Sequence, residues 1–342
     1  MKSSILYLLS LLATLALSRP VDEIAVARAT TDLPRLVIYF QTTHDSNGNP
    51  ISMLPLITEK NISLTHLIVC SFHLNLNYVV HLNDYLPSDP HFTTLWAETQ
   101  VMKNASVKVM GMIGGAAGGS FSSSTLDSTN ATTFAHYYGQ LKDVITTYGL
   151  QGMDLDVEQS MSQSGITRLI NQLYSDFGPD FLITLAPVAS ALENSSNLSG
   201  FDYKTLQSAD GPDIAYNGQF YNGFGTLADT STFDAIVNNG FSAQKVVAGQ
   251  ITSPSDGGGF VDFPTLNNMI IHDPSGTTAP WEWAQEMTAI LRPTQSVNLN
   301  ITPDIANMLK EAWVSSVINT GEGGTESVQV EPNVDYTAMV NA

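Results

Sequence analysis

Short apolar runs alternate with longer amphipathic segments from residue 36 to residue 251 of the chain. The runs have the length and the β-branched and aromatic content that are typical of strands. We predict seven strands, at Leu36–Phe40, His66–Phe72, Val107–Ile113, Gln151–Glu158, Phe181–Ala186, Ile214–Tyr221 and Lys245–Ile251.

The segments between these runs show apolar residues three or four positions apart, which predicts amphipathic helices. One helix is expected to begin at Asp89-Pro90, a capping residue followed by a proline at the first helical position, and to continue to about Met102. A second is predicted over Phe134–Ile145 and a third over Ile166–Leu173. Strands that alternate with helices indicate a parallel α/β sheet, and seven of them fit a (β/α)8 TIM barrel better than a doubly wound sheet.

No strand-like run follows Ile251, so the eighth βα unit is expected to be truncated or missing. Ser253–Gly259 predicts a glycine-rich loop, and Phe263–Ile271 and Pro280–Leu291 have helical spacing. A vestigial strand at Met269–Ile271 is the alternative. Without an eighth strand, a parallel barrel would have two open edges.

The length of 342 residues is sufficient for one large barrel. Near the N-terminus, Lys2 precedes an apolar run from Ile5 to Leu17, which predicts a secretory signal peptide and hence a secreted, extracellular protein. The expected organisation is a signal peptide at 1–18, a linker or pro-segment at 19–32, a catalytic barrel at 33–292 and a helical, acidic C-terminal tail at 293–342.

The composition favours a neutral, sugar-like ligand. The net charge is −19 and charged residues make up only 13% of the chain, so partners such as nucleic acids and anionic membranes are not expected. The protein is expected to be a monomer. Six Asn-x-Ser/Thr sequons fit a secreted glycoprotein, at Asn61, Asn104, Asn130, Asn194, Asn197 and Asn300.

No metal or other cofactor is expected. The seven histidines form no HExxH or His-x-His pattern. The glycine-rich segment 114–119 lacks the Gly-Lys-Ser/Thr of a phosphate loop. The single cysteine, Cys70, lies in an apolar run, which favours a buried structural thiol over a nucleophile.

Three carboxylates alternate with apolar residues within Gln151–Glu158. On a strand, Asp154, Asp156 and Glu158 share one face, with neighbours roughly 7 Å apart. Three acids so close cannot all ionise at low cost, so at least one pKa should rise. A solvated polar strand face is the alternative, but it would hold three like charges in register without any gain. We therefore interpret this segment as a catalytic strand, whose C-terminal end holds the chemistry in a barrel.

Two other predicted strands end in candidate site residues. Gly114 and Gly115 end the third predicted strand, and their lack of a side chain either lets a ligand approach the backbone or permits a tight turn. Residues 219–222, Gln-Phe-Tyr-Asn, end the sixth with three hydrogen-bonding side chains around one aromatic ring.

In their order and spacing these segments resemble the family 18 glycoside hydrolases, the chitinases and endo-β-N-acetylglucosaminidases. The family's D-G-x-D-x-D-x-E is similar to residues 151–158, with Gln151 in place of the first acid. Its S-x-G-G is similar to residues 112–115, with Met112 in place of the serine, and its Q-x-Y-N to residues 219–222. The resemblance covers about Leu36 to Ile251. Residues 39–45 and 152–159 look most like the secreted fungal endo-β-N-acetylglucosaminidases.

The resemblance implies a substrate-assisted, retaining cleavage of the GlcNAc-β-1,4-GlcNAc bond. Glu158 would act as general acid and then as base, Asp156 would orient the substrate's 2-acetamido group, and Tyr221 would hold its oxygen. Asp154 would share a proton with Asp156, so that the two titrate as a coupled pair. The substrate contacts implied by the resemblance are Gln219, Asn222, Tyr39, Gly114 and Gly115.

Two departures from the family pattern bear on this site. The replaced serine hydrogen-bonds the inner aspartate in the family, so Met112 leaves Tyr39 as the expected donor to Asp154, which should then be protonated more easily. Family members also place a Trp on the eighth strand. Trp281 and Trp283 lie in a similar stretch, but Pro280 and the helical spacing after it put both in a helix, so neither is assigned to the site.

Three functions remain open at this point. An endo-β-N-acetylglucosaminidase acting on N-glycan cores is favoured by the local resemblance and by the lack of a chitin-binding module. A chitinase acting on chitin oligomers is the first alternative, although the chain has only four Trp residues to line a cleft. A catalytically impaired carbohydrate-binding lectin is the second. The presence of Glu158 argues against a lectin, whereas the missing strand argues for one.

Overall fold

The computed structural model describes residues 35–266, apart from residues 59–61, 63, 75–78, 209–213 and 263. The predicted signal peptide, linker and C-terminal tail, the alternative strand at 269–271, the helix at 280–291 and both Trp281 and Trp283 lie outside the described residues. Of the helix expected over 263–271, residues 264–266 are described and are helical.

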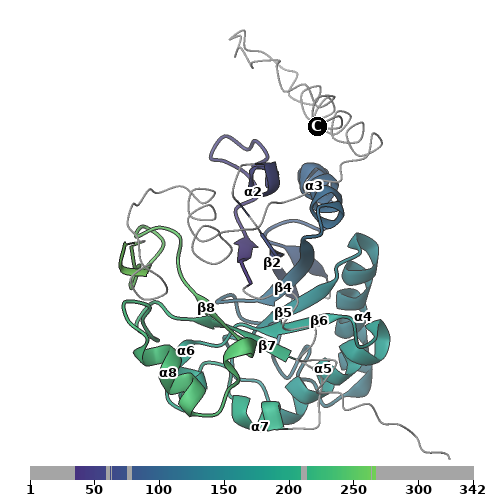
Figure 1. Ribbon diagram of the computed structural model, residues 1–342. Coiled ribbons are helices and arrows are strands. Elements are labelled where there is room, and N and C mark those ends of the chain that lie inside the picture. The colour runs from purple at the N-terminus through teal and green to yellow at the C-terminus, as the bar shows by residue number, and fades with distance from the viewer. Residues whose placement is uncertain are drawn as a thin grey trace, which may run out of the picture.

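Seven parallel strands form one curled sheet, in the order β1-β2-β4-β5-β6-β7-β8 (Figure 1). Each lies within one of the predicted runs or extends it by one or two residues, so the strand predictions are confirmed. The strands are β1 (Val37–Phe40), β2 (His66–Leu74), β4 (Lys108–Gly114), β5 (Gly152–Asp156), β6 (Leu182–Leu185), β7 (Ile214–Gln219) and β8 (Val246–Gly249). The sequence analysis missed β3 (Val80–Leu82), which pairs antiparallel with β2 and is too short to show a period.

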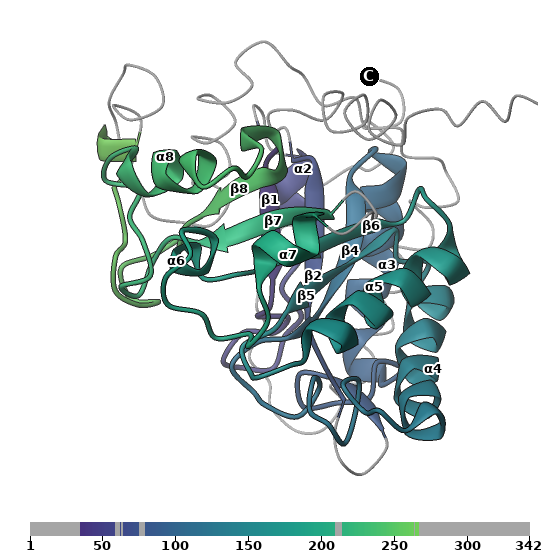
Figure 2. The ribbon, with the colours of Figure 1, turned by 90° about the horizontal axis from the view of Figure 1, so that it is seen from below.

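The three predicted helices are confirmed as η1 with α3, α4 and α5, which lie side by side along one flank of the sheet (Figure 2). Their ends follow from the sequence: Asp89, Asn130 and Ser162 cap the N-termini through their side chains, and Gly149 ends α4 in the left-handed conformation. The helical elements are α2 (Pro55–Thr58), η1 (Pro90–Phe92), α3 (Thr93–Asn104), α4 (Ala131–Tyr148), α5 (Gln163–Phe177), α6 (Ala189–Leu192), α7 (Tyr203–Ser208), α8 (Ser231–Asn238) and η2 (Ala243–Lys245). None of the described helices is long and apolar enough to cross a bilayer.

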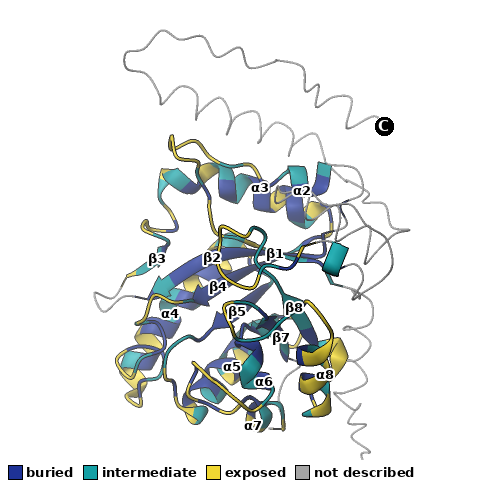
Figure 3. Cartoon of the chain, turned by 90° about the vertical axis from the view of Figure 1, so that its left-hand side faces the viewer, coloured by how far each residue is buried: buried dark blue, intermediate teal, exposed yellow. Residues whose placement is uncertain are grey.

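The alternation along β5 separates two environments. Met153 and Leu155 belong to the large apolar core that the sheet shares with the helices, where the strands are buried (Figure 3). Because successive side chains point to opposite faces of a strand, Asp154 and Asp156 point to the inside of the curled sheet. A smaller apolar cluster of Ile68, Cys70, Met110 and Met112 is separate from that large core. Cys70 is a buried free thiol, as predicted.

The described sheet is not closed by strand pairing. Strands β1 and β8 are its two edges, and no described strand pairs with both. The guanidinium of Arg35, which precedes β1, nevertheless donates a hydrogen bond to the carbonyl of Gln244, which precedes β8. The two edges therefore approach each other at their N-terminal ends. The described fold is a (β/α)8 barrel from which the eighth βα unit is missing.

Candidate active site

The three acids of the predicted catalytic strand differ in burial. Asp154 is 0% and Asp156 7% exposed, whereas Glu158, two residues beyond the end of β5, is half-buried. Exposure therefore increases toward the C-terminal end of the strand, which is the end where barrels bind their ligands. Glu158 is the acid that a ligand arriving from solvent reaches first.

Asp154 is held by side chains from three other strands. Its carboxylate accepts hydrogen bonds from the Tyr39 hydroxyl on β1 (3.0 Å), from Asn217 Nδ2 on β7 (3.2 Å) and from the Thr184 hydroxyl on β6. Asn217 Nδ2 also donates to the Tyr39 hydroxyl at 2.9 Å. The expectation that Tyr39 alone would remain as a donor was therefore wrong. Thr184 is the register partner of Asp154 on the next strand, so its hydroxyl lies beside the carboxylate. Met112 has no hydroxyl and cannot donate a hydrogen bond there.

Burial raises the pKa of the two inner carboxyls. The pKa of Asp154 is raised to about 6 by burial, against the hydrogen bonds from Thr184, Tyr39 and Asn217, which stabilise its charged form. The pKa of Asp156 is raised well above its usual range by burial first, and then by the charges of Glu158 and Asp154. The prediction that at least one acid would have a raised pKa is confirmed. The pair therefore keeps a proton at a pH where an exposed aspartic acid has lost it.

Gln219, at the end of β7, bridges two of the acids. Its Nε2 lies 3.3 Å from Asp156 Oδ1, 3.2 Å from Glu158 Oε1 and 3.0 Å from the carbonyl oxygen of Ala186. One amide group thus lies between two carboxylates that would otherwise repel each other. The side-chain amide of Gln219 is hydrogen-bonded to the acids in this structure. If Gln219 also contacts the substrate, the same amide must bind the acids and the substrate together.

Tyr221 also belongs to this cluster. Its half-buried side chain follows the end of β7, and its pKa is raised above the usual value by burial and by the charges of Asp156, Glu158 and Asp154. The hydroxyl therefore stays protonated at neutral pH and is available as a hydrogen-bond donor in front of the acids.

Asn222 contacts the glycine-rich loop after β8. Its side chain is exposed, and its Oδ1 accepts a hydrogen bond from the Gly258 N–H at 2.8 Å, while its own N–H donates to the Gly258 carbonyl at 2.8 Å. Asn222 thus joins the end of β7 to the glycine-rich loop after β8, rather than facing the acids. A Cβ at Gly257 would lie 2.6 Å from Asn222 Oδ1, so a side chain there would displace the Asn222 amide.

Gly114 and Gly115 meet the backbone of the catalytic strand. A Cβ on Gly114 would lie 2.1 Å from the Asp156 carbonyl oxygen, so close packing of β4 on β5 accounts for this glycine. The Gly115 N–H donates to the same carbonyl at 2.9 Å, and a Cβ there would lie 3.7 Å from Asp156 Oδ2. Of the two, only Gly115 faces an acid side chain.

The model of glycosyl hydrolases family 18 matches residues 35–250. This chain belongs to glycosyl hydrolase family 18. A solved fungal endo-β-N-acetylglucosaminidase of the family is 62% identical, with 77% of this chain and 100% of that chain covered and a TM-score of 0.73.

The chitinase ChiC from Aspergillus fumigatus is 41% identical, covers 74% of this chain and 98% of its own, and has a TM-score of 0.66. A family 18 chitinase from Pseudoalteromonas aurantia, at 17% identity and a TM-score of 0.57, shares the fold over 74% of this chain and 99% of its own. No curated protein matches the chain. The family 18 chain is thus a glycosidase.

The replaced first acid of the family 18 motif has a structural role. Gln151 Oε1 accepts a hydrogen bond from the Val109 N–H at 3.0 Å, and the Gln151 N–H donates to the Val109 carbonyl at 2.8 Å. These bonds tie β5 to β4 at the end opposite Glu158. The Gln151 side chain therefore holds the N-terminal ends of these two strands together.

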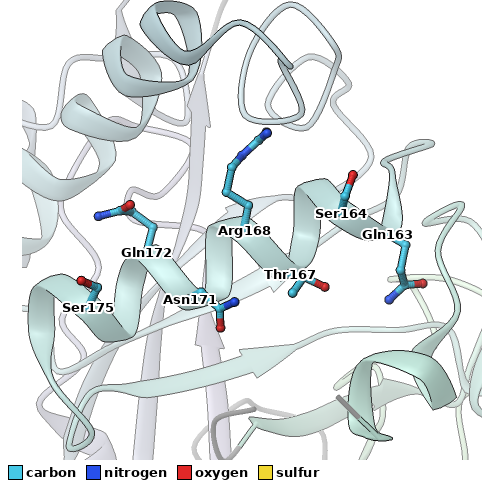
Figure 4. Close-up of a pocket in the computed structure, with 7 residues that line it drawn as sticks. All are labelled: Gln163, Ser164, Thr167, Arg168, Asn171, Gln172 and Ser175. Carbon is cyan, nitrogen blue, oxygen red and sulfur yellow. The ribbon is translucent and has the colours of Figure 1, made fainter. Parts of the chain in front are cut away.

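A cavity of about 810 Å³ lies on the outward face of α5 (Figure 4). Uncharged polar side chains of this helix line it together with Arg168. The Arg168 guanidinium lies 4.4 Å from the ring centroid of Phe134 and donates to the Leu126 carbonyl at 3.1 Å. No acid lines this cavity, and within the described residues no group of three His, Cys, Asp or Glu is arranged to hold a metal ion.

Replacing Thr184 with Val should shift the pH dependence of this family 18 enzyme. The substitution removes one donor to Asp154 while keeping the side-chain shape. Because that hydrogen bond stabilises the ionised form, its loss should raise the pKa of Asp154 above about 6. A bond to a charged group contributes about 1.5–3 kcal/mol, which is about one to two pKa units. The alkaline limb of the kcat–pH profile should move upward by that amount. Thr184→Ser, which keeps the hydroxyl, is the control, and an unmoved limb in Thr184→Val would show that Asp154 does not set it.

Proposed function

We propose that this chain is a secreted endo-β-N-acetylglucosaminidase that cleaves the GlcNAc-β-1,4-GlcNAc bond of N-glycan cores with retention of configuration. One observation carries the proposal: Glu158 lies at the mouth of a cluster in which Asp156 and Asp154 have raised pKa values and Tyr221 is a protonated donor. The proposal is supported by the fungal endo-β-N-acetylglucosaminidase, whose whole chain aligns at 62% identity.

Cleavage begins at Glu158. Its protonated carboxyl donates the proton to the glycosidic oxygen as the bond to the anomeric carbon breaks. The oxygen of the substrate's own 2-acetamido group forms the new bond to that carbon, so no side chain of the enzyme is needed as a nucleophile. The leaving sugar departs with the proton that Glu158 supplied.

Asp156 and Tyr221 act on the acetamido group. Asp156 accepts a hydrogen bond from the acetamido N–H. Its carboxylate stabilises the positive charge that builds on the acetamido group as its oxygen closes a ring onto the anomeric carbon. The proton that Asp154 and Asp156 share then resides on Asp154, whose complete burial favours the neutral carboxyl. The Tyr221 hydroxyl donates to the acetamido oxygen and holds it below the anomeric carbon.

Glu158 completes the reaction as a base. Having lost its proton, it accepts one from a water molecule that attacks the anomeric carbon and opens the ring formed by the acetamido group. Attack takes place on the face that the leaving group vacated, so the product keeps the configuration of the substrate.

Substrate choice is tested by incubating the chain with a high-mannose glycoprotein and, separately, with chitin oligomers. The chain should release from a high-mannose glycoprotein a glycan that ends in one GlcNAc, and leave the second GlcNAc on the protein. It should leave chitin oligomers largely uncut. Mass spectrometry of both products is the measurement. Cleavage of chitin oligomers with an intact glycoprotein would instead support the second candidate, a chitinase, which the 41% identity to ChiC favours.

A further inference from the structure

A pocket of about 690 Å³ lies where β1, β2 and β3 end, and the reaction proposed above does not use it. Its volume is in the range of small-ligand pockets. Four of the chain's seven histidines line it, together with residues of the loop that follows β1. These histidines are His44, His73, His81 and His91.

The pocket adjoins the acids along two of its walls. One wall, residues 41–44, directly follows Tyr39 and Phe40, and the Tyr39 hydroxyl is bonded to Asp154. Another wall includes Ala117, two residues after Gly115, which faces the Asp156 carboxylate. A ligand that lies over the acids can therefore extend into the pocket without leaving the protein surface.

A partly exposed aromatic stack forms part of the lining. The rings of His44 and His91 are stacked with centroids 3.4 Å apart, and Tyr85 stacks on His91 at 4.3 Å. Tyr85, the outer member, is 44% exposed. A flat ring beside polar side chains offers a surface for the C–H face of a sugar, whose hydroxyls can then reach the polar groups.

The remaining lining fits an uncharged, hydroxyl-rich ligand. In the part of the chain that the structure describes, no Lys or Arg lines the pocket, and Asp84 is its one acid. Burial lowers the pKa of both His44 and His73, so these rings are neutral at neutral pH. Among the described residues, the buried Nδ1 atom of His73 has no hydrogen-bond partner, and such a group requires one from water or ligand. A sugar hydroxyl is suited to this position.

We propose that this pocket binds a neutral hexose branch of the substrate, at a distance from the bond that is cut, and that Tyr85 is the stacking residue. The inference rests on the proposed function. A branched N-glycan has arms that can fill a pocket beside the acids, whereas linear chitin has no branch to place there. The pocket is thus a determinant of substrate choice.

Tyr85→Ala tests the stacking surface against two substrates. KM for a high-mannose glycan linked to asparagine should rise about 3- to 10-fold with kcat unchanged, the loss typical of one aromatic contact. The core trisaccharide, one mannose on two GlcNAc residues, should show no change because it has no arm. Tyr85→Phe should restore the KM of the native protein. Leu86→Ala, which truncates an equally exposed neighbour outside the pocket, is the matched control. An equal effect on both substrates, or none on either, would overturn the proposal.

Binding measured without turnover separates this inference from the proposed function. In a Glu158→Gln background, calorimetry with the high-mannose glycan should show the same 3- to 10-fold loss of affinity on Tyr85→Ala. An affinity that does not change on Tyr85→Ala would refute the proposed hexose-binding pocket even if the native chain is active. Tyr85-dependent binding by a chain that cleaves neither substrate would instead refute the enzymatic proposal and leave the pocket standing.

Discussion

Glu158→Gln is expected to lower kcat on a high-mannose glycopeptide by about 10²–10⁴-fold, the usual contribution of a general acid and base. The amide has the shape of the carboxyl but can neither give a proton to the glycosidic oxygen nor take one from water. It can still accept the hydrogen bond that Gln219 Nε2 donates at 3.2 Å, so the geometry of the cluster should be preserved. Affinity for the glycan should therefore stay within about twofold.

Single-turnover kinetics and calorimetry on the same preparation measure the two quantities separately. A kcat of Glu158→Gln close to that of the native chain would show that another group protonates the leaving sugar. A native chain that binds the glycan without cutting it, and does so equally well after the substitution, would be a lectin.

Asp156→Asn is expected to lower kcat by about 10²–10³-fold and at the same time to stabilise the fold at pH 7. The loss follows because the neutral amide no longer stabilises the positive charge on the acetamido group. The gain follows because the pKa of Asp156 in the folded protein is raised, chiefly by burial, above its unfolded value. Such a group costs stability progressively as pH rises from the unfolded pKa, about 4, through the folded pKa. Asn does not ionise and avoids that cost.

Thermal unfolding at two pH values checks the sign. The Tm of Asp156→Asn should exceed that of the native chain at pH 7, and the difference should shrink toward pH 4. Asp229→Asn is the control of opposite sign, because hydrogen bonds from Ser231 hold the pKa of the exposed Asp229 below its usual range. Its Tm should not rise at pH 7. A lower Tm for Asp156→Asn at pH 7 would contradict the claim that the buried Asp156 carboxyl destabilises the fold and is retained for catalysis.

The features that were predictable from the sequence are those fixed by local periodicity. The two-residue period of 153–157 puts Asp154 and Asp156 on one face whatever the rest of the chain does, and Asp89-Pro90 marks a helix start by its own chemistry. These patterns were sufficient for seven strands, three helices and the location of the acids.

The features that were missed depend on register and on loops. Thr184 hydrogen-bonds Asp154 only because β6 pairs with β5 in the register that sets these two residues side by side. Asn217, on the strand beyond β6, donates another hydrogen bond to Asp154. The hydrogen bond between Asn222 and Gly258 joins two loops that are far apart in the sequence. The four-histidine pocket joins residues of β2, β3, η1 and the loops after β1 and β4, and no spacing along the chain reveals it.

The claim on which the account depends is that the substrate's acetamido oxygen, not a side chain, attacks the anomeric carbon. The most direct test compares two core glycans that differ only at the sugar whose anomeric carbon is attacked, one with its 2-acetamido group and one with a hydroxyl in its place. We predict rapid cleavage of the first and no detectable cleavage of the second, although both should bind. Comparable rates on the two would contradict the mechanism, because a carboxylate of the enzyme would then have to be the nucleophile.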